Sequence, residues 1–184
     1  KRISLATYRE TVVIPAVDFY VQHGIDRDTL MNNAKDVSEI FHSSYERRSS
    51  KVRTRRSARK LLSWLSDNSI ESIILSDHTL SGVESQLQRL NLRTYFSHVL
   101  ANSDQDTSLK KRRKQKRLEI FLKNNSVKPG HALIIGDSPQ EVEAGKHVGI
   151  TTVSITDGFF STRRLKETNP DYLISNLNQL IGII

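Results

Sequence analysis

Cysteine is absent from all 184 residues, which excludes disulfide bonds and metal sites built from thiolates. The six histidines show no metal-ligand spacing, so an imidazole site is not expected either. No apolar run approaches the roughly 20 residues that a membrane helix requires, and we recognise no secretory signal. We therefore expect no membrane insertion. A chain without cysteine fits a reducing compartment, which would be the cytoplasm or, alternatively, the mitochondrial or another organellar matrix.

Acidic residues are missing from two segments that carry most of the basic groups. Residues 47–60 hold eight basic groups and residues 110–117 hold seven, whereas the rest has 13 basic and 20 acidic groups, a formal charge of −7. Such clusters favour an anionic partner: a phosphorylated compound, RNA or ribonucleoprotein, or an acidic protein face. Solvated basic loops would give the same pattern, and neither cluster has the interleaved aromatics of a base-stacking surface. The candidate anion-binding residues are Arg53, Arg55, Arg56, Lys111, Arg112, Arg113 and Lys114.

A chain of this length suits one medium domain with room for a small appendage. From about residue 56 onward, segments with helical periodicity alternate with short β-branched runs, which is typical of an α/β fold with a parallel sheet. Before that, helices are expected over residues 9–23 and 30–45, followed by an exposed linker over 46–56. We therefore predict the start of the core over residues 1–8, a small helical cap over 9–55 and the α/β core over 56–184.

Residues 132–156 combine a strand, an acidic turn, a helix and a second strand. A short apolar run ends at Gly136-Asp137, and a β-branched run follows over residues 150–155. In such units the turn lies at the carboxyl end of a strand, where parallel sheets bind ligands. Asp137 and Glu141, one helical turn apart, are therefore a candidate site for a hard cation with oxygen ligands.

The same residues also match a helix start. Ser138-x-x-Glu141 is a capping box, in which the serine caps the helix and the glutamate reaches back to the serine amide. Both roles stay open for Glu141, whereas Asp137 precedes the cap, so a structural role explains it less well. A second sequence of this type, Ser81-x-x-Glu84, predicts another helix start.

Polar residues follow three strand-like runs, at Ser76-Asp77, Asn102-Ser103-Asp104 and Gly136-Asp137. In a parallel sheet these ends share one edge. Together with a lysine and a magnesium ion, they would form a site for a phosphate monoester, because the hydroxyl and ammonium hold oxygens while the metal neutralises charge.

The sequence resembles the haloacid dehalogenase superfamily from about Tyr8 to its end, in particular phosphoglycolate-phosphatase-like hydrolases with a small helical cap. IILSD at residues 73–77 is similar to the second motif, in which a serine, here Ser76, binds the transferring phosphoryl group. Gly136-Asp137-x-x-x-Glu141 is similar to the fourth motif, whose acids hold Mg²⁺ directly or through water. The resemblance implies a Rossmann-like parallel sheet, Mg²⁺ as cofactor and a phosphorylated small molecule as substrate.

The third motif of the family contributes a lysine just before the helix that includes Phe121. The chain reads KKRRKQKRLEIF there, so either Lys116 or Lys114 matches, and we take Lys116 as the candidate catalytic lysine beside Ser76. A surface lysine in this basic run is the alternative.

The first motif, Asp-x-Asp-Gly-Thr, would supply the nucleophilic aspartate and an aspartate that acts as general acid and base. It should stand just before Tyr8, where the chain reads KRISLAT and has no acid before Glu10. If Leu5 aligns with the leucine after the motif, Arg2 replaces the second aspartate, which excludes general acid chemistry there near neutral pH. In the family this motif ends the central strand, so we expect that strand upstream of Lys1 or from elsewhere.

Two functions therefore remain open. In the first, the chain is a Mg²⁺-dependent phosphohydrolase whose missing aspartates lie upstream, and Ser76, Lys116, Asp137 and Glu141 complete the site. Alternatively, it is a catalytically inactive member that docks on RNA, a ribonucleoprotein or a protein partner through the two basic segments.

Overall fold

The structure, a computed structural model, describes residues 3–103 and 114–184. These residues fold into two compact units. The first comprises residues 3–11, 55–68 and 114–184, and the second comprises residues 12–54 and 69–103. The helices of residues 12–54 thus belong to the same unit as the first two strands, and the expected division into a cap over 9–55 and a core over 56–184 stays a prediction.

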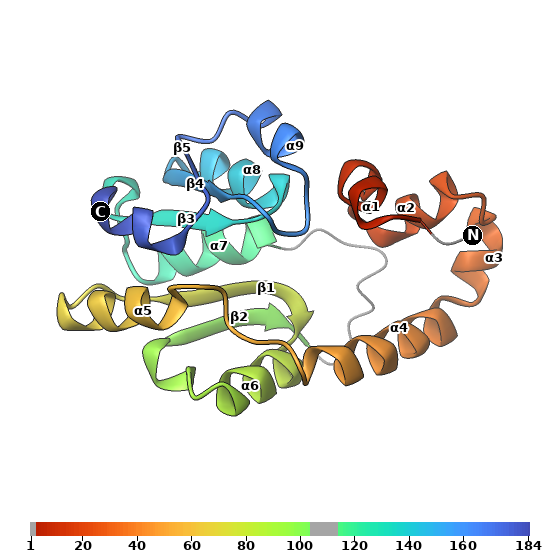
Figure 1. Ribbon diagram of the computed structural model, residues 1–184, viewed down its shortest axis with the longest axis horizontal. Helices are drawn as coiled ribbons and strands as arrows, with labels where there is room; N and C mark the ends of the chain where they lie inside the picture. The colour runs from red at the N-terminus through yellow and green to blue at the C-terminus, as the bar shows by residue number, and fades with distance from the viewer. Residues whose placement is uncertain (1–2, 104–113) are drawn as a thin grey trace. The chain divides into compact units, whose positions relative to one another are not determined.

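The first unit is built on a parallel sheet in the order β3-β4-β5 (Figure 1). The strands are β3 (Leu133–Gly136), β4 (Thr151–Ile155) and β5 (Tyr172–Ile174). Their apolar and β-branched side chains form the core of the unit, and Thr152 and Ser154 of the central strand are fully buried. A strand with neighbours on both sides and helices on its faces is expected to lack solvent-facing positions.

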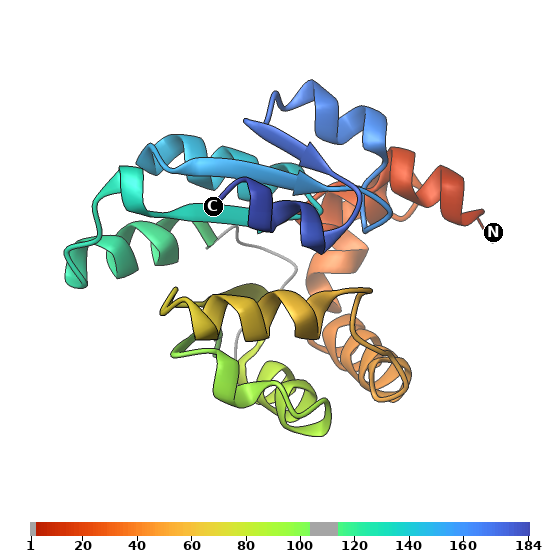
Figure 2. The ribbon, with the colours of Figure 1, turned by 60° about the vertical axis from the view of Figure 1, so that its left-hand side comes forward.

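Helices cover both faces of this sheet. α8 (Pro139–Val148) packs on β3 and β4, with α7 (Lys114–Asn124) beside it. In Figure 2 the short 3-10 helix η3 (Leu177–Gly182) lies on the opposite face, and α5 (Ala58–Asp67) packs against η3. The unit also contains α1 (Leu5–Thr11), η2 (Pro129–His131) and α9 (Thr162–Glu167).

The second unit has a two-stranded parallel sheet of β1 (Ile73–Thr79) and β2 (His98–Asn102). α6 (Leu80–Arg89) crosses between the two strands and packs on both of them, and η1 (Arg93–Tyr95) follows it. The helices α2 (Ala16–Gln22), α3 (Arg27–Asn32) and α4 (Ala34–Ser49) precede the sheet in sequence and pack in succession. Parallel strands with intervening helices in both units confirm the predicted α/β class.

Three predicted elements differ from the structure. The helix expected over residues 9–23 is interrupted between Thr11 and Ala16, because Pro15 disfavours a helical residue before it. The helix expected over residues 30–45 is divided at Asn33 into α3 and α4, and α4 continues to Ser49, into the expected linker. α6 begins before Ser81, since the Thr79 side chain accepts the hydrogen bond from Gly82 N and so caps the helix.

Throughout the described ranges, the helices are too short or too polar to cross a lipid bilayer.

Candidate active site

Asp137 stands directly after β3, at the carboxyl end of the strand, as the sequence predicts. Its Oδ2 accepts a hydrogen bond from Phe159 N at 3.0 Å, and its carbonyl oxygen accepts one from Phe160 N at 3.3 Å. The side chain is half-buried. The turn after β3 and the loop after β4 therefore meet at this carboxylate, because parallel neighbours in a sheet end at the same edge.

Glu141 caps the start of α8. Its Oε2 accepts hydrogen bonds from Ser138 N at 3.0 Å and from Ser138 Oγ at 2.6 Å, while Ser138 Oγ accepts one from Gln140 N. The capping-box interpretation of this motif is thus confirmed. A Cβ on Gly136 would overlap the Glu141 side chain, so the glycine before Asp137 leaves room for this cap.

The other oxygen of Glu141 binds a lysine. Lys114 Nζ donates to Oε1 of Glu141, and the two side chains are 16% and 9% exposed. Lys116, two residues further along α7, is exposed. The structure therefore places Lys114, one of the two lysines that matched the third motif, beside Glu141 of the fourth motif.

The described donor set fits a magnesium ion only in part. Within residues 3–103 and 114–184, no three histidine, aspartate or glutamate side chains gather in a way that could hold a metal ion. Both oxygens of Glu141 are engaged by Ser138 and Lys114, which leaves Asp137 as the candidate direct ligand. Magnesium commonly binds through one or two carboxylates and keeps several waters or phosphate oxygens as ligands. Asp137 therefore provides one of the ligands that such a site requires.

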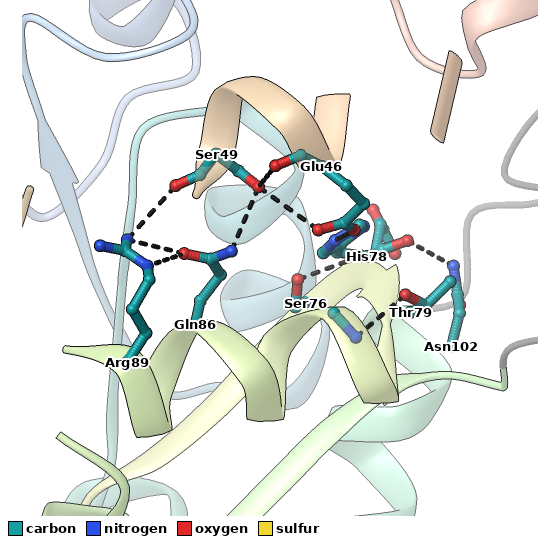
Figure 3. Close-up of polar contacts among 10 residues, drawn as sticks. Glu46, Ser49, Ser76, His78, Thr79, Gln86, Arg89 and Asn102 are labelled. Atoms are coloured by element: carbon teal, nitrogen blue, oxygen red, sulfur yellow. Dashed lines mark hydrogen bonds and ion pairs between the residues drawn. The ribbon is translucent and has the colours of Figure 1, made fainter. Parts of the chain in front are cut away.

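Ser76 lies in the second unit, in the irregular part of β1 where the pairing register with β2 shifts between Leu75 and Thr79. Its Oγ accepts a hydrogen bond from His78 N at 3.1 Å (Figure 3). Asn102, at the end of β2, donates from its side chain to the carbonyl oxygen of Asp77. The polar residues, which were expected to follow these strands, thus lie in the last part of β1 and at the end of β2, where Asn102 meets Asp77. The convergence of Ser76 with Asp137 stays a prediction.

A polar cluster around His78 was not predicted from the sequence. His78 Nε2 lies 2.7 Å from Oε1 of Glu46, and the His78 ring packs edge-on against Tyr45 with centroids 4.9 Å apart. Ser49 Oγ in turn donates to the carbonyl oxygen of Glu46 (Figure 3). These groups of α4 are held beside the residues that follow Ser76, and only packing brings such distant parts of the sequence together.

α6 completes the same cluster from the opposite side (Figure 3). Gln86 donates from its amide to Ser49 Oγ at 3.2 Å, and Arg89 donates to the carbonyl oxygens of Ser49 and Val52 at 3.3 and 2.7 Å. These bonds satisfy carbonyl groups at and beyond the C-terminus of α4, which have no partner within the helix.

Apart from Lys114, which pairs with Glu141, the basic candidates divide into three groups. Arg55 donates from Nη1 to the carbonyl oxygen of Thr156 at 2.9 Å, so this guanidinium stabilises the chain after β4. Arg53 and Arg56 are exposed. Lys111, Arg112 and Arg113 lie outside the described residues.

Residues 5–155 match the family model of haloacid dehalogenase-like hydrolases. The chain belongs to this family. Among solved structures, a haloacid dehalogenase-like hydrolase from Streptococcus pneumoniae aligns with a TM-score of 0.76 and 19% identity, over 92% of this chain and 76% of that one. The predicted resemblance and the Rossmann-like sheet are thereby confirmed.

Two curated haloacid dehalogenase relatives are phosphoglycolate phosphatases. The protein from Pseudomonas fluorescens is 27% identical over 148 residues, which cover 80% of this chain and 53% of the relative. The protein from Synechococcus elongatus is 32% identical over 124 residues, which cover 67% of this chain and 56% of the relative. The chain thus spans about half the length of the curated relatives that it matches.

Proposed function

We propose that the chain belongs to a Mg²⁺-dependent phosphohydrolase that acts on a phosphate monoester. One observation carries this proposal: Lys114 pairs with Glu141 beside Asp137 at the carboxyl end of β3. A half-buried ammonium held by a carboxylate near the carboxyl end of a parallel strand suits a phosphorylated ligand better than it suits a neutral one. The family and its phosphatase relatives support the same reaction class.

Each residue has a distinct role in this proposal. Asp137 would hold the cation, which when bound would neutralise charge on the phosphoryl oxygens. Ser76 would donate its hydroxyl hydrogen to one of those oxygens. Lys114, oriented by Glu141, would hold another oxygen by charge, and Lys116 is the alternative for this role.

Residues 1–9 do not supply the nucleophile, because they contain no acidic side chain. The reaction requires an aspartate that attacks phosphorus and a second acid that protonates the leaving alkoxide. The proposal therefore holds for a protein in which such a pair precedes Leu5, where the family places it.

Phosphate release by the full-length protein in Mg²⁺ tests the proposal, with phosphoglycolate as the first substrate because two relatives carry that name. We expect Asp137→Asn to reduce kcat/KM at least 100-fold, since loss of one metal ligand removes several kcal/mol of transition-state stabilisation. Asp67→Asn, at the exposed end of α5, should leave the rate unchanged. Absence of turnover across a panel of monoesters would contradict the proposal.

A second candidate function is favoured by the exposure of basic groups in the segment of residues 47–60. All but Arg55 are exposed, namely Arg47, Arg48, Lys51, Arg53, Arg56, Arg59 and Lys60. In this alternative, the chain is an inactive binding module for RNA, with a ribonucleoprotein or an acidic protein as other partners. Binding of a generic RNA should then weaken steeply with salt, because each neutralised phosphate releases a counterion. Undetectable or salt-insensitive binding would contradict it.

A further inference from the structure

The loop that follows β4, residues 157–161, holds Asp137 from one side. Phe159 N donates to Oδ2 of the carboxylate, and Phe160 N donates to the Asp137 carbonyl oxygen. Phe160 itself is buried, with 3% of its surface exposed. Within the described parts of the chain, the hydrogen bond to this carboxylate falls on Oδ2 and not on Oδ1. The loop therefore distinguishes the two carboxylate oxygens.

Gly158 shows how closely the loop approaches the Asp137 side chain. A Cβ at this position would overlap Oδ2, Cγ and Cβ of Asp137, and these are its three nearest heavy atoms. The backbone of Gly158 does not adopt a positive φ, so an alanine would suffer from this overlap and not from its own conformation. One added methyl group would thus displace the Asp137 carboxylate specifically.

α1 braces the loop from the other side. Arg9 Nη2 donates to the carbonyl oxygen of Asp157 at 3.1 Å, and Ser161 N donates to the Arg9 carbonyl oxygen at 3.2 Å. Beyond the loop, Arg163 pairs with Glu10 at 2.6 Å. Hydrogen bonds from Arg163 and Ser161 lower the pKa of Glu10, which keeps this partner ionised. Both ends of the loop are therefore tied to consecutive residues of α1.

An aromatic contact ties the middle of the loop to the same helix. The rings of Tyr8 and Phe159 meet edge-on with centroids 5.3 Å apart. Arg164 lies 4.5 Å from the centroid of the Phe160 ring and also donates to the Arg9 carbonyl oxygen. The residue that donates to Asp137 Oδ2 is thus itself positioned by α1.

We propose that α1 is a positioning element for the cation site: through residues 157–161 it fixes the Asp137 carboxylate so that Oδ1 is presented to a divalent metal ion. This inference rests on the proposed function. Hydrogen bonds that orient a metal ligand commonly change metal affinity by about 10- to 100-fold when they are removed. Tyr8, Arg9 and Gly158 are therefore positioning residues, and Asp137 is the ligand.

Mn²⁺ binding to the full-length protein, followed by electron paramagnetic resonance, tests the inference without reference to turnover. We expect Arg9→Ala to weaken Mn²⁺ binding about tenfold and Gly158→Ala to weaken it about 100-fold. Gly130→Ala is the matched control, because nothing lies within 4 Å of a Cβ at that position, and its affinity should equal that of the parent.

Amide hydrogen exchange, measured in the absence of metal, provides a second test of whether α1 holds the loop. The Phe159 amide should exchange slowly in the parent and in Gly130→Ala, and at least tenfold faster in Arg9→Ala, because the loop is then released from α1. If Arg9→Ala fails to fold, Tyr8→Ala, which loses one ring contact with the loop, replaces it in both measurements.

The outcomes separate this inference from the function on which it rests. If Asp137→Ala abolishes Mn²⁺ binding while Arg9→Ala and Gly158→Ala bind like the control, the inference is overturned and the cation site stands. A parent that binds no Mn²⁺, or binds it independently of Asp137, would overturn both the inference and the metal part of the proposed function.

Discussion

Lys114 and Glu141, from the first turns of α7 and α8, form a half-buried ion pair in which Lys114 donates to the oxygen that the capping box leaves available. Glu141 therefore has a structural and an electrostatic role at once. Its Oε2 completes the start of α8, and its Oε1 accepts a hydrogen bond from the Lys114 ammonium group. This pairing couples the stability of α8 to the geometry of the candidate active site.

Lys114→Met should lower the free energy of unfolding by about 2–3 kcal/mol, because it leaves the buried Glu141 carboxylate without its cationic partner. Lys116→Met is the matched control and should change stability by less than about 0.5 kcal/mol, since this lysine is exposed. Urea denaturation of both variants checks this. Equal losses in the two variants would show that the ion pair does not stabilise the fold.

Ser138→Ala should destabilise the protein by about 1 kcal/mol, because the hydroxyl caps α8 and also donates to Glu141. Ser63→Ala, on the exposed side of α5, provides the control and should be neutral or slightly stabilising, since alanine is the better helix former. Thermal melts followed by circular dichroism compare the two. A melting temperature for Ser138→Ala equal to that of the control would contradict the cap.

Gly145→Ala should cost about 1–3 kcal/mol of stability, because an added Cβ would overlap methyl groups of Ile134 and Thr152 where α8 crosses the sheet. Gly130→Ala meets no neighbour and is expected to be neutral or slightly stabilising. Chemical denaturation distinguishes the two substitutions. A well-tolerated alanine at position 145 would mean that α8 lies further from β3 and β4 than the structure shows.

Asp171 should make stability depend on pH in the acidic range. Hydrogen bonds from Thr152 N and Thr152 Oγ1 to its carboxylate lower the pKa of Asp171. The stabilisation is therefore complete above the ordinary carboxyl pKa of about 4 and disappears as the pH falls through the lower pKa of the folded state.

Denaturation midpoints measured between about pH 2 and 6 test this coupling. Asp171→Asn should lose about 1 kcal/mol near neutral pH, a modest value because the carboxylate is exposed, and its acid-induced loss of stability should be smaller than that of the parent. If the two proteins show the same pH dependence, the Thr152–Asp171 hydrogen bonds do not account for it.

Local patterns predicted the fold around Asp137 well. The strand, turn, helix and strand of residues 132–156 occur as expected, since their signals lie within a few residues of each other. The capping box formed for the same reason, because Ser138 and Glu141 are neighbours on one turn. Pro15 was itself a local signal for the break before α2. The helical periodicity of the residues on either side of it nevertheless favoured one continuous helix.

The choice between Lys114 and Lys116 had no local signal. Two residues along an α-helix differ by about 200° in direction, so one of these lysines faces α8 and the other faces water. Which one does so depends on how α7 packs, and a run of seven basic groups offers no pattern to decide it. Arg55 was grouped with the anion-binding candidates for a similar reason, since its contact with Thr156 joins distant parts of the chain.

The α/β class, the family and the position of Asp137 at a strand end could be predicted from the sequence alone, because turn residues, periodicity and motif spacing are short-range properties. Three features could be recognised only from the folded chain: which lysine meets Glu141, the engagement of both Glu141 oxygens, and the contacts of α1 with the loop behind Asp137. Such contacts arise when helices and loops pack, and packing depends on side-chain shape and burial across the whole unit.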